Sequence, residues 1–195
     1  GWGNCLAHPW GNFMIGDKNN LCIGFLGRLD PSKGVEDVIQ VVRKLRKELP
    51  IKLFIAGTGD KEYERMLRAK AKGLPVEFLG HVAPEDLFRS IHCLVVPSRW
   101  HGSFGLVIIE SYTFGIPVIG AARGGIPEII DEGKTGWLYD PDIPGDLERV
   151  IIKTFANKDE IDEIGQQGQR KAEDFTIEKC VRKYLACYIK SSGRA

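Results

Sequence analysis

The sequence predicts an α/β fold, a Rossmann-like, doubly wound parallel sheet. Short apolar runs alternate along the chain with longer segments of helical periodicity, a pattern typical of sheets built from strand–helix–strand units. After Pro144 the strand signal fades and helical patterns follow one another, which predicts extra helices at the C-terminal end. A chain of 195 residues fits one ordinary domain that buries roughly two-thirds of its unfolded surface.

Six apolar runs are the predicted strands of this sheet. In such a sheet, ligands bind beyond the carboxyl ends of the strands, where the loops meet. The predicted strands are Leu21–Gly27, Lys52–Gly57, Val76–Gly80, His92–Val96, Pro117–Gly120 and Gly136–Tyr139.

The clearest predicted helix lies between the first two strands. Apolar residues recur at helical spacing from Val35 to Leu49, basic residues between Arg43 and Lys47 take the other faces, and Pro50 ends the pattern. That basic face offers only weak support for contact with a membrane, because such a run is usually solvated. The other predicted helices are Lys61–Lys72, Pro84–Ser90, Leu106–Phe114, Pro127–Asp131, Gly145–Asn157, Asp159–Asp174 and Thr176–Lys190.

Composition argues against several classes of function. The 27 basic and 26 acidic side chains give a net charge of +1, whereas a nucleic-acid surface needs a clear excess of Lys and Arg. No apolar run approaches the roughly 20 residues of a membrane span, and no signal peptide is expected. The five cysteines form no CxxC pair, which argues against a metal site or a disulfide framework and favours a reducing, cytoplasmic environment.

The segment after the fourth predicted strand is the strongest candidate for a binding site. It reads PSRWHGSFGLVIIES, and Gly102 and Gly105 precede the helix expected from Leu106. Backbone N–H groups at such a helix start stabilise an anion, and a carboxylate deeper in the helix, Glu110, suits the hydroxyls of a sugar. Together these features predict a nucleotide-sugar site.

Arg28 and Lys33 lie on the loop that leaves the first predicted strand, in GFLGRLDPSKG. A nucleotide diphosphate is a leaving group with concentrated negative charge, and two cations at its oxygens would stabilise bond cleavage without a metal. Taken alone, the segment fits a solvated turn with a helix-capping Ser32 better, because turns of this composition are common.

Other turns are open to more than one interpretation. Gly57–Gly59 is too short for a GxGxxG fingerprint and fits either close approach to a ligand or a simple strand-to-helix turn. Gly124–Gly125 also permits close approach, although Pro127 and Glu128 after it would start a helix equally well. Asp140–Asp142 resembles a metal-binding DxD only superficially, and a proline-containing turn is the favoured interpretation.

The histidines differ in their expected roles. His92 begins an apolar run and is expected to be structural. His81 follows the third predicted strand and is placed to face the cleft. His101 adjoins Gly102 and is the strongest candidate for a ligand contact. No residue is assigned as a catalytic base, because that role depends on geometry.

Six motifs carry a resemblance to a known family. They are GFLGRLDPSKG, LFIAGTGD, VEFLGHV, VVPSRW with SFGLVIIES, GIPVIGAARGGIPEII and GKTGWLYDP. From Ile23 to Tyr184 the chain resembles the nucleotide-binding C-terminal half of GT-B glycosyltransferases of family 4, the glycosyl transferases group 1. Each motif is weak alone, but six in the same order are specific.

The resemblance implies a donor-binding role for the matching positions. Arg28 and Lys33 would hold the donor diphosphate and stabilise the leaving group, and Glu110 would bind the ribose hydroxyls. No cofactor is implied, since the nucleotide-sugar is the donor substrate, and a metal ion is not expected to be essential because Arg28 and Lys33 would stabilise the charge. The rest of the implied site comprises Phe104, Gly105 and Leu106 at the sugar and its phosphates, His81 and Val82 at the nucleobase, and Gly57, Gly59 and Gly124–Gly125 along the cleft.

One position departs from the family pattern. The first acid of the family's E-x7-E element contacts donor-sugar hydroxyls, and the residue eight positions before Glu110 is Gly102. A glycine supplies no carboxylate, which lowers the expected affinity for the donor sugar and the expected turnover. His101 would replace the acid only in part, because a neutral imidazole has one acceptor.

The resemblance also implies a domain organisation. Residues 1–20 would be a lead-in segment, 21–190 the donor-binding domain and 191–195 a tail, and the N-terminal acceptor domain is absent. In the family the last helix packs on that acceptor half. Residues Thr176–Lys190 would therefore keep an exposed apolar stripe of Tyr184, Leu185, Tyr188 and Ile189.

The implied function is the donor half of a retaining glycosyltransferase of the hexosyltransferase type, which moves a sugar from an NDP-sugar to a hydroxyl acceptor. A glycan, lipid or small-molecule acceptor would bind the missing half, so the isolated chain would transfer little or nothing. A lipid acceptor would add peripheral contact with the cytoplasmic face of a membrane.

The alternative is a non-catalytic nucleotide-binding or assembly module completed by a separate chain. A nicotinamide-dependent dehydrogenase needs GxGxxG after its first strand, which this sequence lacks.

Overall fold

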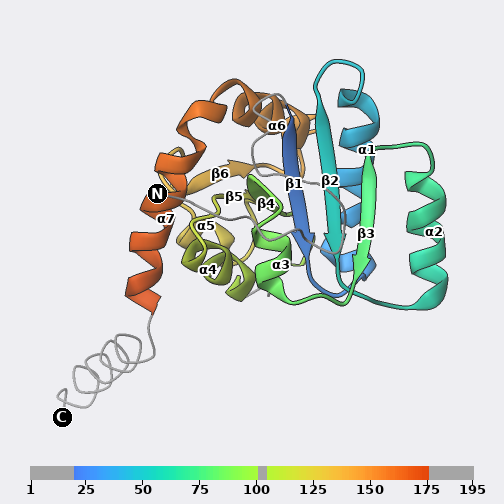
Figure 1. Ribbon diagram of the computed structural model, residues 1–195, viewed down its shortest axis with the longest axis horizontal. Coiled ribbons are helices and arrows are strands. Elements are labelled where there is room, and N and C mark those ends of the chain that lie inside the picture. The colour runs from blue at the N-terminus through green and yellow to red at the C-terminus, as the bar shows by residue number, and fades with distance from the viewer. Residues whose placement is uncertain (1–19, 101–104, 176–195) are drawn as a thin grey trace, which may run out of the picture.

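A computed structural model describes residues 20–100 and 105–175 of the chain. Six parallel strands form one sheet in the order β3-β2-β1-β4-β5-β6, with helices on both faces (Figure 1). This is the strand order of a doubly wound Rossmann sheet, and it confirms the predicted fold class. The strands are β1 (Leu21–Leu26), β2 (Ile51–Ala56), β3 (Val76–Gly80), β4 (Cys93–Val96), β5 (Val118–Ala121) and β6 (Gly136–Tyr139).

All six predicted strands are present, and their bounds differ from the predicted ones by at most one residue at either end. Most of the predicted helices are present as well, and Thr176–Lys190 lies outside the described residues. The helices are α1 (Val35–Leu45), α2 (Lys61–Ala71), α3 (Pro84–Phe88), α4 (Leu106–Thr113), α5 (Ile126–Ile129), α6 (Asp146–Ala156) and α7 (Ile161–Ala172), with short 3-10 turns η1 (Pro31–Lys33), η2 (Lys158–Glu160) and η3 (Glu173–Phe175).

The first helix is shorter than its apolar pattern predicted. Regular α1 ends at Leu45, and the chain then turns before Leu49. The residue before a proline is disfavoured in the helical conformation, so Pro50 disfavours a helical Leu49. Leu49 still packs against the core from this turn, which explains why it fits the apolar period.

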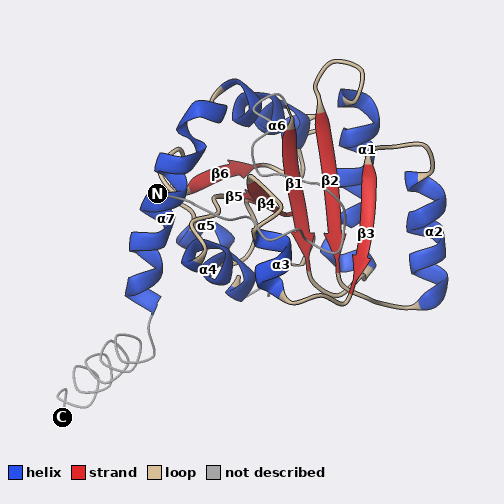
Figure 2. Ribbon diagram, in the orientation of Figure 1, coloured by secondary structure: helices blue, strands red, loops and turns tan. Residues whose placement is uncertain are grey.

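Alternate residues of the strands face two separate cores. On β4, Cys93 and Val95 belong to the first core, and Leu94 and Val96 belong to the second, as the two-residue period of a strand requires. The first core lies between the sheet and the helices α1, α2 and α6, and the second lies between the opposite face and α3, α4 and α5 (Figure 2). Both faces are thus covered, as a parallel sheet requires.

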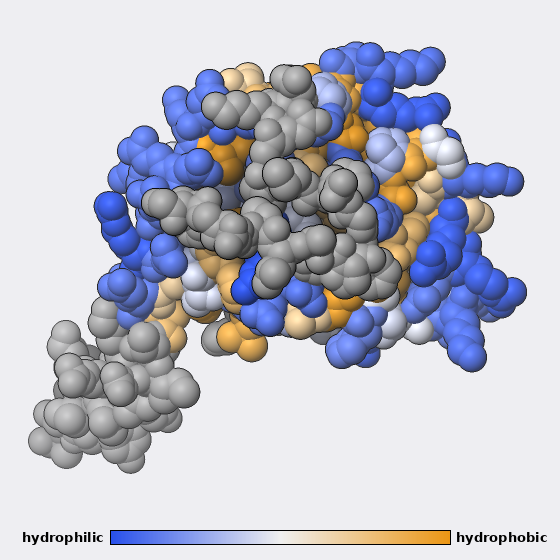
Figure 3. Space-filling model, in the orientation of Figure 1, coloured by the Kyte–Doolittle hydropathy of each residue, from blue (hydrophilic) through white to orange (hydrophobic). Residues whose placement is uncertain are grey.

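The polar faces of the outer helices form much of the surface. Hydrophilic side chains gather on the side of the molecule where α2 lies (Figure 3). The basic run of α1 contributes to this surface through local contacts: Lys44 Nζ lies 2.9 Å from Glu148 Oε2, and Arg46 Nη1 donates to the Gly73 carbonyl at 2.8 Å. Among the helices that the structure describes, none has the length and apolar character needed to cross a membrane.

Candidate functional site

The centre of the sheet contains a topological switch point. The chain runs outward from β1 through β2 to β3 in one direction, and from β4 through β5 to β6 in the other, while β1 and β4 pair directly. The loops that follow β1 and β4 therefore lead to opposite sides and leave a crevice between them. Ligands of open α/β sheets bind in this crevice.

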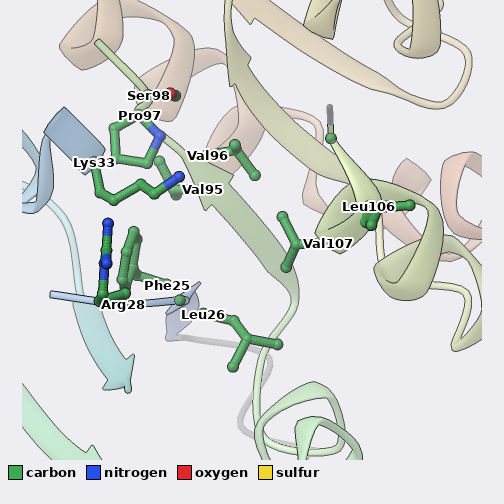
Figure 4. Close-up of a pocket in the computed structure, with 12 residues that line it drawn as sticks. Phe25, Leu26, Arg28, Lys33, Val95, Val96, Pro97, Ser98, Leu106 and Val107 are labelled. Carbon is green, nitrogen blue, oxygen red and sulfur yellow. The ribbon is translucent and has the colours of Figure 1, made fainter. Parts of the chain in front are cut away.

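A pocket with a volume of about 430 Å³ occupies this position (Figure 4). Its walls come from the end of β1, the turn before α1, the end of β4 and the start of α4. The lining residues are Phe25, Leu26, Gly27, Arg28, Lys33, Val95, Val96, Pro97, Ser98, Gly105, Leu106 and Val107.

Arg28 and Lys33, the two cations that the sequence predicted for this site, both line the pocket. Their side chains lie on one side of it, whereas Leu106 and Val107 lie on the other (Figure 4). Neither cation forms an ion pair with any residue in the described parts of the chain. Their charge is therefore available to an anion in the pocket.

The turn that carries Lys33 is capped differently from the prediction. Asp30, not Ser32, is the cap of η1, and its carboxylate accepts hydrogen bonds from both the hydroxyl and the backbone N–H of Ser32. These two bonds hold the pKa of Asp30 below its usual value, with the hydroxyl having the larger effect. Asp30 precedes Pro31, whose fixed φ suits the first position of a helical turn, so the cap moves to the residue before the proline.

The start of α4 forms the wall opposite the cations. Gly105 is its N-cap, in the left-handed conformation at φ 60°, and the helix continues through Leu106 and Val107. The N–H groups of these two residues belong to the first turn, so no carbonyl within the helix is available to them. Since the first turn contains no acidic residue, its partial positive charge adds to that of Arg28 and Lys33.

Glu110 lies one helical turn beyond the pocket wall. It is exposed and four residues after Leu106, which places it on the same face of α4. It does not line the pocket itself.

Gly57 and Gly59 do not line the pocket but support the loop that does. Gly57 has φ +135°, and a Cβ there would lie 1.8 Å from the Gly27 carbonyl oxygen; a Cβ at Gly59 would lie 2.0 Å from that of Leu29. The two loops are joined by hydrogen bonds from Gly27 N to the Ala56 carbonyl and from Leu29 N to the Thr58 carbonyl, at 3.0 and 2.9 Å. These glycines allow the loop after β2 to lie against the loop that carries Arg28.

The remaining predicted site residues are more distant from the pocket walls. His81 is exposed directly after β3, at the edge of the sheet, and Val82 beside it packs against the second core. Gly124–Gly125 forms the turn between β5 and α5 and does not line the pocket. The predicted contacts His101 and Phe104, together with Gly102, lie outside the described residues.

Two other sequence interpretations can be followed in the structure. His92 is held within the fold, because its Nδ1 accepts a hydrogen bond from Cys22 N at 2.9 Å and burial lowers its pKa. Asp140–Asp142 forms a turn, in which Asp142 N donates to Asp140 Oδ1 at 2.9 Å. No group of three or more His, Cys, Asp or Glu residues in the described ranges is arranged to hold a metal ion.

Sequence reasoning missed residues that the fold brings to the site from afar. Ser98 is almost fully buried and lines the pocket. Arg99 beside it pairs with Asp37, a residue 62 positions earlier in the chain. The PS dipeptide directly after the fourth predicted strand was the available signal for Ser98, whereas the Arg99–Asp37 pair has no sequence signal.

With this geometry in place, comparison with known proteins decides the family. Residues 15–171 match the protein family described as "Glycosyl transferases group 1". The chain belongs to this family. It is similar to an uncharacterised glycosyltransferase of Methanocaldococcus jannaschii, at 31% identity over 160 residues covering 80% of this chain and 44% of that protein. It is also similar to D-inositol 3-phosphate glycosyltransferase of Gordonia bronchialis, at 30% identity over 190 residues covering 90% and 41%. This group 1 chain thus spans less than half the length of these relatives.

Solved structures confirm the Rossmann-like fold of this family member. Sucrose-phosphate synthase of Thermosynechococcus elongatus aligns with a TM-score of 0.74 at 24% identity, over 91% of this chain and 47% of that one. HepE of Anabaena in complex with UDP and glucose aligns with a TM-score of 0.75 at 23% identity, over 89% and 49%. The C-terminal domain of LpcC, a group 1 family protein of Francisella tularensis, aligns with a TM-score of 0.66 at 22% identity, over 80% and 85%. These neighbours are GT-B glycosyltransferases.

Proposed function

We propose that this chain is the nucleotide-sugar-binding half of a retaining glycosyltransferase. The observation that carries the proposal is the pocket at the switch point, where Arg28 and Lys33 lie opposite the N-terminus of α4. Two unpaired cations and a helix start around one cavity suit an anion with several oxygens, such as the diphosphate of an NDP-sugar. Family membership supplies the reaction class.

The proposed reaction needs charge stabilisation at the leaving group. The bond between the anomeric carbon and the diphosphate oxygen breaks, a bond from the acceptor hydroxyl oxygen forms, and the acceptor proton is released. The departing diphosphate takes the electron pair and gains negative charge, which Arg28 meets with a planar fork and Lys33 with a point charge. The first-turn N–H groups of α4 add a third source of positive potential.

The other predicted contacts fit around this diphosphate. Glu110, one helical turn after Leu106, is proposed to accept hydrogen bonds from the ribose hydroxyls, and the nucleobase would extend toward the β3 side, near His81 and Val82. The structure of HepE, whose fold is similar, contains UDP and glucose, which supports a nucleotide-sugar as the ligand class.

The acceptor is proposed to bind a second half of the complete enzyme. Because the chain covers only 41% and 44% of the relatives described above, a glycan, lipid or small-molecule acceptor would contact the part that this chain does not include. The chain alone is proposed to bind the donor and transfer little. Gly102, where the family has an acid, favours a second candidate, a nucleotide-binding module that serves a partner chain.

Calorimetric titration of the chain with UDP, GDP and ADP, each with and without its sugar, tests the proposal. We expect saturable binding of one of the three and a loss of about tenfold or more in affinity for Arg28→Ala and for Glu110→Ala, because each removes a charged hydrogen-bonding partner. Arg65→Ala, which changes an exposed cation on α2, is the matched control and should bind as the wild type does.

The outcomes separate the two candidates. Extra affinity contributed by the sugar supports the donor half of an enzyme, whereas equal affinity for the nucleotide and its sugar conjugate supports the module. Binding that survives both substitutions, or no binding of any of the three nucleotides, contradicts both candidates.

A further inference from the structure

The turn that carries Lys33 is held against the segment that follows β4. Arg99 N donates a hydrogen bond to the carbonyl of Ser32 at 2.8 Å, immediately before Lys33. Immediately after it, Gly34 lies so close to Pro97 that a Cβ would come within 2.1 Å of the Pro97 carbonyl oxygen. Lys33 is therefore flanked on both sides by backbone contacts with the segment Pro97–Arg99.

A bidentate ion pair reinforces this attachment. Arg99 Nε lies 3.0 Å from Asp37 Oδ2, and Arg99 Nη2 lies 2.6 Å from Asp37 Oδ1. Asp37 is in the first turn of α1, and its own N–H donates to the Gly34 carbonyl at 3.0 Å. Two parallel hydrogen bonds fix the orientation of the two groups as well as their separation.

Arg99 also connects this turn to the loops of the strands beyond β4. The Arg99 carbonyl accepts a hydrogen bond from Arg123 Nη1 at 3.3 Å. The guanidinium of Arg123 also binds Asp142, which follows β6. Arg99 and Arg123 together thereby connect the loops after β1, β5 and β6 at the carboxyl ends of the strands, where the pocket lies. Neither residue lines the pocket itself.

We infer that Arg99, through its pair with Asp37, is a positioning residue that sets where the Lys33 ammonium meets the donor phosphates. The inference rests on the proposed function, in which Lys33 contacts the diphosphate. A lysine ammonium sits on a flexible four-carbon stem, so its placement depends on how firmly the backbone at its base is held. Arg99 holds that backbone from both sides, directly through Ser32 and indirectly through Asp37.

A double-mutant cycle with calorimetric titration tests this role, using whichever of UDP, GDP and ADP the wild-type chain binds. Arg99→Ala should weaken binding by about fivefold, because it loosens a charge-assisted contact without removing it. In a Lys33→Ala background the same substitution should change affinity by less than about twofold, because residues that act through one contact are not additive. Arg99→Lys, which keeps the charge but not the planar fork, should have an affinity between those of the wild type and Arg99→Ala.

Three comparisons keep the test specific. Asp37→Asn, which keeps the shape of the side chain, should reproduce the loss if the ion pair causes it. Arg149→Ala removes an exposed ion pair with Asp146 on α6 and should leave affinity unchanged. The nucleoside without phosphates should bind the wild type and Arg99→Ala equally.

The possible failures are distinct. An equal loss in both backgrounds, or a loss that extends to the nucleoside, would show a general structural effect and overturn the positioning role. Unchanged diphosphate affinity in Arg99→Ala would overturn it as well. Absence of binding of all three nucleotides by the wild-type chain overturns the proposed function itself, and this inference with it.

Discussion

Arg28 and Lys33 decide what the pocket is suited to bind. Their side chains share one wall of a cavity whose other lining residues are apolar apart from Ser98 and the glycines. Neither forms an ion pair among the described residues, so an anion in the pocket displaces no existing ion pair. Arg28 is exposed and Lys33 is half-buried, so solvent screens the attraction of Arg28 for an anion more than that of Lys33.

His92 has a structural role that makes stability depend on pH. Burial, followed by the nearby charge of Lys158, lowers its pKa below the ordinary value of 6.5. Below that value the unfolded chain binds the proton more readily than the folded chain, so the free energy of unfolding falls as pH decreases toward the folded-state pKa. The hydrogen bond from Cys22 N requires His92 Nδ1 to be unprotonated, because only an unprotonated nitrogen can accept.

We therefore predict that His92→Asn flattens the pH dependence of stability. The amide oxygen of Asn can accept from Cys22 N but does not titrate, so the loss of unfolding free energy between about pH 7 and about pH 5 should be smaller than in the wild type. Urea denaturation at a series of pH values measures it. An unchanged pH profile in the variant would show that other groups are responsible.

At the scale of elements, the loop after β2 supports the loop after β1. The backbone bridge between Leu29 and Gly59 extends the parallel pairing of the two strands past their ends. Because Gly57 and Gly59 lie against carbonyl oxygens of the β1 loop, any side chain there must push that loop away. Arg28 sits between the two contact points, so its position depends on the glycines of another loop.

Gly57→Ala is predicted to destabilise the protein by about 3 kcal/mol and to weaken nucleotide binding, because it combines an unfavourable φ with a backbone collision. Gly73→Ala is the matched control, since Gly73 also has positive φ, at 73°, but has open space around its Cβ position. The control should cost about 1 kcal/mol and leave binding intact. Chemical denaturation measures both costs. Equal effects of the two substitutions would contradict the supporting role of the β2 loop.

The elements of this fold are predictable from sequence because their signals are local. Each strand is a short apolar run, and the helices between β1 and β3 have clear apolar faces, so element identity follows from periodicity. Details at element ends were less accurate, as at Leu45 and Asp30, because single capping or proline effects decide them.

The site was predictable only where its residues carry a local chemical signal. Arg28, Lys33, Gly105 and Leu106 were predicted and line one pocket. The Arg99–Asp37 pair was not predicted, because it depends on two loops meeting across the fold. For Gly57 the sequence left open close approach to a ligand or a simple turn, and the structure shows close approach to a neighbouring carbonyl.

At the scale of the whole molecule, the described residues form one sheet with a core on each face. The alignment with the solved C-terminal domain of LpcC covers 85% of the LpcC chain. A fold of this extent therefore occurs as a crystallised single unit. The relatives described above are more than twice as long as this chain, which supports the proposal that the pocket works beside a second half. Donor binding by this chain and acceptor binding by another part of the enzyme are what we propose.

The most direct test of donor binding at the switch point is to locate bound nucleotide by the ¹H–¹⁵N NMR spectrum of the chain, adding UDP, GDP and ADP in turn. We predict that one nucleotide shifts the amide signals of Gly27, Lys33, Leu106 and Val107. The signals of Glu48 and Gly73, which lie before the amino ends of β2 and β3, should stay in place. Shifts confined to the amino ends of the strands, or none with any of the three nucleotides, would contradict a donor site at the carboxyl ends of β1 and β4.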